Sequence, residues 1–119
     1  MKQKSIATAH AISVDTMPGL VRRTLGYNKH AMLCHFEIKK GAAIPLHSHA
    51  PVQIGMSLVG KLRFFGVNPG DEFEASAGDG YVIAAYKPHG LSAIEDSTYV
   101  EVFCPARDDY KDGVDVPGT

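Results

Sequence analysis

Glycine and proline recur at short intervals through the middle of the chain, and this spacing limits what the chain can fold into. The segments between them are short and rich in Val, Ile, Phe and Tyr, which is typical of strands joined by turns. Helical periodicity does not survive these breaks for more than about two turns. Strands are expected at residues 20–25, 31–39, 53–59, 61–67, 71–75, 81–85, 90–94 and 98–104. About eight short strands without a long helix predict an all-β sandwich, jelly roll or barrel.

Length and charge restrict the function classes. With 119 residues and a net charge of −1, one domain over 1–119 is expected, with a polar tail at 108–119. Nucleic acid is not an expected partner, because binding it needs clustered Lys and Arg. No apolar run reaches the roughly 20 residues that span a membrane, and the first residues lack the apolar stretch of a signal peptide. We therefore expect a cytoplasmic protein whose cysteines, Cys34 and Cys104, are reduced thiols in the core.

Three of the six histidines are spaced as metal ligands. His47 and His49 are two residues apart, so in an extended segment both imidazoles point to the same face. Gln53 follows a bend at Pro51 and could bring an amide oxygen to the same point, and His89 begins a later strand. Three imidazoles and one oxygen would leave open positions on a divalent transition metal ion, as a catalytic site requires.

These histidines also have an ordinary interpretation. Two histidines separated by one residue are, taken alone, more often a surface or hydrogen-bonded pair, so the metal hypothesis depends on all four residues together. His10, His30 and His35 are expected outside any site. His35 alternates with apolar residues in the same way as Glu37, which is typical of the solvent-exposed face of a strand.

The central segment resembles the first motif of the cupin family, Gly-x5-His-x-His-x3-4-Glu-x6-Gly. Here the motif runs from Gly41 through His47 and His49 to Gly60, with Gln53 in the position of the glutamate. The resemblance implies an all-β fold of the cupin kind, a double-stranded β-helix or jelly-roll barrel.

The second cupin motif, Gly-x5-Pro-x-Gly-x2-His-x3-Asn, is matched in part. Gly78 and His89 fit, whereas Ala84, Tyr86 and Ala93 replace the proline, the glycine and the asparagine. The two motifs together imply a metal ion inside the barrel. The ligands that the resemblance implies are His47, His49, Gln53 and His89.

The chain further resembles the small cupins of the KdgF type, which act in pectin and alginate degradation. The likeness includes the glutamine among the ligands and the Pro-His-Gly run at 88–90. That group has an Asp-x-Phe-x3-Arg pattern near the last strand, and here Glu101, Phe103 and Arg107 occupy it, with glutamate in place of aspartate. The resemblance implies conversion of 4,5-unsaturated monouronates to a linear keto form.

These residues suit that chemistry. Glu101 and Phe103 share a face of the last strand, so in an inward orientation Glu101 can move a proton and Phe103 can pack against the sugar. Arg107 can bind the substrate carboxylate through two parallel hydrogen bonds. Tyr81 and Tyr86 are candidates for the mouth of the pocket. Each of these residues also has an ordinary interpretation, as core packing or as a surface side chain.

Two other functions stay open. A metal-dependent dioxygenase fits the histidines, although Gln53 adds no charge to stabilise an oxidised metal; a sugar-binding or sensor module without catalysis also fits. The ligand set admits Ni, Zn, Fe, Mn or Cu. The expected partner is a small carbohydrate acid. The resemblance also implies a homodimer, in which residues 6–14 contribute a strand that covers a sheet edge.

Overall fold

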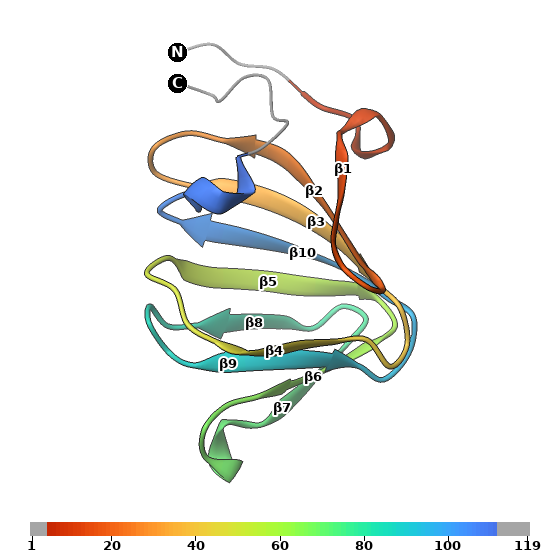
Figure 1. The fold of residues 1–119 in the computed structure, drawn as a ribbon, viewed down its shortest axis with the longest axis vertical. Coiled ribbons are helices and arrows are strands. Elements are labelled where there is room, and N and C mark those ends of the chain that lie inside the picture. The colour runs from red at the N-terminus through yellow and green to blue at the C-terminus, as the bar shows by residue number, and fades with distance from the viewer. Residues whose placement is uncertain (1–4, 112–119) are drawn as a thin grey trace.

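The computed structural model describes residues 5–111, which form ten strands in two antiparallel sheets (Figure 1). One sheet has the order β1-β2-β3-β10-β5-β8, and the other has the order β4-β9-β6-β7. The strands are β1 (Ser13–Met17), β2 (Leu20–Tyr27), β3 (Met32–Ile38), β4 (Ala43–His47), β5 (Val52–Val59), β6 (Lys61–Phe65), β7 (Phe73–Ser76), β8 (Gly80–Ile83), β9 (His89–Ala93) and β10 (Ser97–Cys104). Three short 3-10 helices occupy Thr8–His10, Pro69–Asp71 and Asp108–Tyr110. Within the described residues, no helix is long and apolar enough to cross a membrane.

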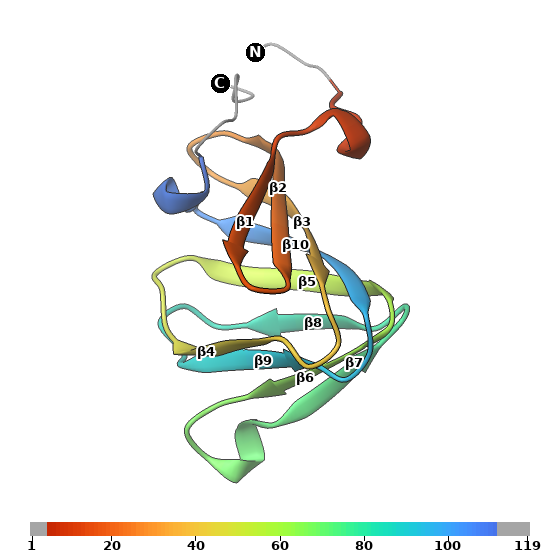
Figure 2. The same cartoon turned by 45° about the vertical axis from the view of Figure 1, so that its right-hand side comes forward.

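The path of the chain confirms the all-β jelly-roll prediction. The chain changes sheet after β3, β4, β5, β7, β8 and β9, as Figure 2 lets the reader follow. Such repeated crossing joins two sheets into one sandwich, because each sheet then consists of strands that are distant in sequence. One cluster of buried residues, drawn from both sheets, fills the space between them.

Two strands, β1 and β4, were not expected from the sequence pattern. β4 lies at the edge of its sheet and contains Pro45, which lacks the N–H that an inner strand needs. Its side chains are exposed or half-buried, so the alternation of apolar residues is weak. β1 pairs with β2 of the same chain, and it takes up only residues 13 and 14 of the segment that was expected to serve a dimer.

The core residues of β3 and β10 alternate strictly between the two faces of the sheet. The inward residues of β3 are buried while Glu37 and Leu33 are exposed. The same alternation in β10 buries Tyr99, Glu101 and Phe103 together. The predicted shared inward face of Glu101 and Phe103 is therefore confirmed, and it places a carboxyl group in the interior of the sandwich.

The two cysteines have different environments, and the expectation that both lie in the core is wrong for one of them. Cys34 is buried on β3, where desolvation raises the pKa of its thiol to about 11. Cys104 is exposed at the end of β10. It follows Phe103 directly, and adjacent residues of a strand point to opposite faces, so Cys104 points away from the core.

Candidate functional site

The fold brings the three predicted histidine ligands together. His47 ends β4, His49 lies in the loop before β5, and His89 begins β9, directly opposite His47 in the strand pairing. One ligand atom from each imidazole lies within 4.8 Å of the others. The remaining histidines lie outside this cluster: His10 and His30 are exposed, and His35 is half-buried on β3.

Backbone carbonyls orient all three imidazoles. Nδ1 of His47 lies 2.9 Å from the carbonyl oxygen of Pro45, and Nδ1 of His49 lies 2.8 Å from that of Pro51. Nδ1 of His89 lies 2.8 Å from the carbonyl oxygen of Lys87. Because a carbonyl oxygen only accepts, each Nδ1 must carry the proton and donate it. In the neutral rings, each Nε2 therefore keeps a lone pair that can bind a cation.

Gln53 adds an oxygen to this cluster. Its Nε2 donates to Oε2 of Glu101, which leaves Oε1 facing Nε2 of His49 at 3.1 Å. Desolvation by burial lowers the pKa of His49, so the neutral ring predominates near pH 7 and two acceptor atoms face each other. Two lone pairs at this separation repel unless a positive charge lies between them.

His89 supplies a second sign of a cation site. Its Nε2 is buried and has no hydrogen-bond partner among the described residues. Desolvation lowers the pKa of His89 to about 4, so the ring is neutral near pH 7 and the lone pair is available. A buried polar atom without a partner is costly unless a ligand satisfies it. The four residues His47, His49, Gln53 and His89 therefore fit a divalent transition metal ion, as expected for nitrogen ligands with one neutral oxygen.

Glu101 lies behind Gln53 and is fully buried. Its Oε2 accepts hydrogen bonds from Gln53 Nε2 and from the hydroxyl of Tyr81, the latter at 2.7 Å. Desolvation raises the pKa of Glu101 to about 7, although these hydrogen bonds and the charge of Arg107 oppose the rise. Near neutral pH the carboxyl group is therefore present in both protonation states, which suits a group that takes up and returns a proton.

The contact between Tyr81 and Glu101 depends on the glycine at position 55, which has no side chain. Glu101, Gly55 and Tyr81 lie in one row across β10, β5 and β8. A Cβ atom at Gly55 would lie 2.6 Å from the Tyr81 ring, so only glycine lets this ring cross β5 to reach the carboxylate. Tyr81 is buried rather than at the mouth, whereas Tyr86 is exposed.

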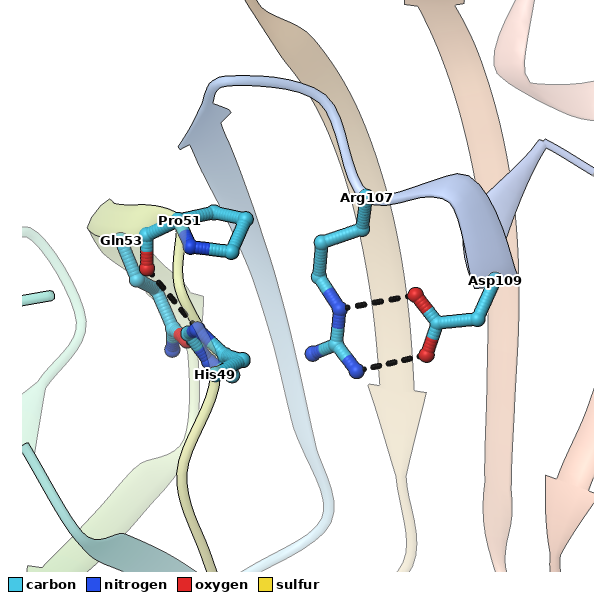
Figure 3. A network of polar contacts seen from close by, with 5 residues as sticks. All are labelled: His49, Pro51, Gln53, Arg107 and Asp109. Atoms are coloured by element: carbon cyan, nitrogen blue, oxygen red, sulfur yellow. Dashed lines mark hydrogen bonds and ion pairs between the residues drawn. The ribbon is translucent and has the colours of Figure 1, made fainter. Parts of the chain in front are cut away.

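Phe103 and Arg107 complete the predicted set. Phe103 is almost fully buried, with its ring edge-on to His49 at 5.8 Å between ring centroids, so it contacts the imidazole instead of offering an open face for a sugar. Arg107 pairs with Asp109 through two hydrogen bonds of 3.1 and 2.7 Å, which Figure 3 shows beside His49 and Gln53. Sequence reasoning missed Asp109, because an acid two residues from an arginine is not a recognisable motif.

The space between these residues is small. A cavity of about 30 Å³ is lined by His47, Gln53, His89, Glu101 and Arg107 together with aromatic and aliphatic residues. This volume is large enough for water but too small for a sugar ring. His47 and His49 are half-buried and so face the solvent side of this space, whereas Glu101 is buried on its inner side.

Comparison with known proteins identifies the family. The profile of the Cupin domain family matches residues 34–104, which is more than half of the chain. The chain belongs to the cupin family. None of the curated protein sequences matches this cupin. The match spans both histidine segments, so the resemblance inferred from the two motifs is confirmed at the level of the family.

Solved structures show the same architecture. KdgF from Halomonas sp. is 28% identical, with a TM-score of 0.81 over 92% of this cupin and 98% of that chain. An RmlC-like cupin from Shewanella frigidimarina is 24% identical, with a TM-score of 0.83 over 92% and 96%. The polyketide cyclase RemF from Streptomyces resistomycificus is 17% identical, with a TM-score of 0.76 over 92% of both chains. The last two likenesses concern the fold alone.

Proposed function

We propose that this cupin converts 4,5-unsaturated monouronates, as derived from pectin or alginate, into their linear keto form. The observation that carries the proposal is a buried carboxylic acid, Glu101, hydrogen-bonded to Gln53 at the back of a cluster of three histidines. The similarity to KdgF over nearly the whole chain supports the same class of substrate.

His47, His49 and His89 would hold a divalent transition metal ion through Nε2, and Gln53 through Oε1. Such an ion, bound by neutral ligands, supplies a Lewis acid for the substrate carboxylate and for negative charge that develops on the ring oxygen. Gln53 has a second task in this arrangement, since its amide Nε2 also fixes the carboxylate of Glu101.

Glu101 would carry the proton that the reaction moves. In the forward direction the carboxylate takes the proton of the C1 hydroxyl, a C1=O double bond forms, and the bond from C1 to the ring oxygen breaks. The enolate at C4 and C5 then takes a proton at C4, and a C5 ketone results. No atom is lost and no electron acceptor is needed, so one acid that accepts and returns a proton suffices. In the metal-free protein, burial raises the pKa of Glu101 to about 7, so this carboxyl group can both hold and release a proton near neutral pH.

The path from Glu101 to the substrate passes through the small cavity. Since Glu101 is enclosed and a uronate ring would bind at the mouth, we assign the proton transfer to one water molecule in the cavity of about 30 Å³. Arg107 also lines this cavity, and its guanidinium would bind the substrate carboxylate. Phe103 would keep the imidazole of His49 in place, because its ring packs against that imidazole.

The direct test is an assay with an unsaturated monouronate and metal-loaded protein. We expect loss of absorbance at the conjugated double bond and appearance of a linear ketone. Glu101→Gln and Arg107→Ala should each lower kcat/KM by about 100-fold or more while metal content is unchanged. Glu74→Gln and Arg63→Ala serve as matched controls, because both side chains are exposed. Conversion by both site variants at the parental rate would show that these roles are wrong.

The same experiment separates the alternatives. Oxygen consumption with loss of substrate would indicate a dioxygenase, and recovery of the uronate unchanged after long incubation would indicate a binding module.

We place the reaction in the cytoplasm and propose that the protein acts as a homodimer. Light scattering that gives the mass of one chain would contradict the dimer.

A further inference from the structure

The guanidinium of Arg107 is held more firmly than a surface arginine. Its Nε and Nη2 donate to the two carboxylate oxygens of Asp109, which is the two-bond geometry that fixes a guanidinium plane. The side chain of Arg107 is only 13% exposed, whereas that of Asp109 is 62% exposed. Asp109 therefore approaches from the solvent side and holds a group that is itself mostly enclosed.

Aromatic rings fix the same guanidinium from other directions. The centroid of the Tyr110 ring lies 3.9 Å from Cζ of Arg107, and that of the Phe103 ring lies 5.3 Å away. The backbone of Tyr110 is held by a hydrogen bond of 2.6 Å from Thr24 to its carbonyl oxygen, and its ring packs edge-on to that of Phe103 at 5.5 Å between centroids. A planar cation bound along one edge and stacked on a ring has little rotational freedom.

In the part of the chain that the structure describes, this orientation leaves one edge of the Arg107 guanidinium without a hydrogen-bond partner. An arginine has five N–H donors, and Asp109 engages the Nε and Nη2 edge. In Figure 3, the remaining nitrogen of Arg107 points away from Asp109, toward the side where His49 and Gln53 lie. Arg107 also lines the same cavity as His47, Gln53 and Glu101. The second edge of the guanidinium is therefore presented to the site.

We propose that Asp109 is a positioning residue, which holds Arg107 so that its free edge receives the carboxylate of the substrate. This inference rests on the proposed function, because it takes the ligand to be a uronate. Asp109 touches no substrate; it acts through Arg107. Without Asp109 the guanidinium could rotate toward solvent, and each binding event would then have to order it again.

The first measurement needs no ligand. The NMR signal of the Nε–H proton of Arg107 reports how firmly the guanidinium is held. It can be assigned by its loss in Arg107→Lys. In Asp109→Ala, exchange of this proton with water should speed up by about 10-fold or more, because its acceptor is gone. Asp108→Ala is the matched control, since Asp108 is 94% exposed and bonds Lys111 instead; it should leave the signal unchanged. An unchanged signal in Asp109→Ala would overturn the proposal.

The second measurement tests the link to the site. In the assay with unsaturated monouronate, Asp109→Ala should raise KM by about 10-fold with less than about a twofold change in kcat, and Asp109→Glu should restore most of the KM. In the background of Arg107→Lys, Asp109→Ala should cause no further rise. A KM equal to that of the parent, or the same rise in both backgrounds, would overturn the proposal while the proposed function stands. A parent protein without turnover would instead overturn the proposed function, and with it the ligand assigned to Arg107.

Discussion

Glu101 shows how much one residue depends on its surroundings. A carboxylate enclosed by apolar side chains is costly to ionise. Hydrogen bonds from Gln53 and Tyr81 and the charge of Arg107 offset part of that cost, so the pKa of Glu101 rises to about 7 and no further. The protonation state of Glu101 therefore depends on a balance between burial and three specific neighbours.

This balance predicts a pH-dependent stability in the metal-free protein. The pKa of Glu101 is higher in the folded state than its ordinary value of 4.5. Its contribution to stability is therefore complete below about pH 4.5 and is lost as the pH rises to about 7, by on the order of 3 kcal/mol. Urea unfolding between pH 4.5 and 8 should show this loss in the parent and in the exposed control Glu74→Gln, and a smaller loss in Glu101→Gln. Equal losses in all three proteins would contradict the raised pKa.

Residue spacing along the chain predicted part of the site. His47, His49 and Gln53 lie within seven positions of each other, so the local geometry of an extended segment was enough to group them. The hydrogen bond from Tyr81 to Glu101 could not be predicted from the sequence, because it depends on the position of β5 between β8 and β10. Partners that meet across a sheet leave no periodic signal in the sequence.

Among the elements, β5 separates the acid from the tyrosine that supports it. Gly55 is the residue of β5 that lies in the same row as both side chains. β5 therefore cannot carry a side chain at position 55. The same reasoning explains why β4 was missed in the sequence: an exposed edge strand with a proline carries neither apolar alternation nor a full set of donors.

Gly55→Ala is expected to disturb this row. The added Cβ would lie 2.6 Å from the Tyr81 ring, so the ring must shift and its hydrogen bond to Glu101 is weakened. We expect a loss of about 1–3 kcal/mol in the free energy of unfolding and a further rise in the pKa of Glu101. Gly80→Ala is the control, because the nearest atom to its Cβ lies at an ordinary contact distance of 3.6 Å. Thermal unfolding measures the loss of stability, and the pH dependence of turnover measures the rise in the pKa of Glu101. Identical behaviour of Gly55→Ala and Gly80→Ala would contradict the argument.

At the scale of the whole molecule, the candidate metal ligands connect the two sheets. His47 and His89 belong to β4 and β9 of one sheet, and Gln53 belongs to β5 of the other. An ion bound by all of them would be a cross-link across the sandwich. The sequence predicted this closure only through the family resemblance, since composition and turn spacing fit sandwiches, jelly rolls and barrels equally well.

Metal binding should therefore stabilise the fold. A ligand that binds only the folded state adds stability in proportion to the logarithm of its concentration over Kd, about 3 kcal/mol at 100 times Kd. Adding Ni²⁺ or Zn²⁺ to chelator-treated protein should raise Tm by several degrees. His89→Ala should abolish most of the rise, whereas His30→Ala, at an exposed position, should keep it. A rise that is equal in both variants would show that the ion binds elsewhere.

The backbone groups that orient the imidazoles have a consequence for engineering. Two of the three acceptor carbonyls belong to prolines, Pro45 and Pro51, and the third belongs to Lys87, which directly precedes Pro88. Proline restricts its own backbone and that of the residue before it, so the three imidazoles are oriented by segments with few alternative backbone conformations. Selectivity among ions would consequently be tunable at positions that never touch the ion, and a mutational scan confined to the coordinating side chains would overlook them.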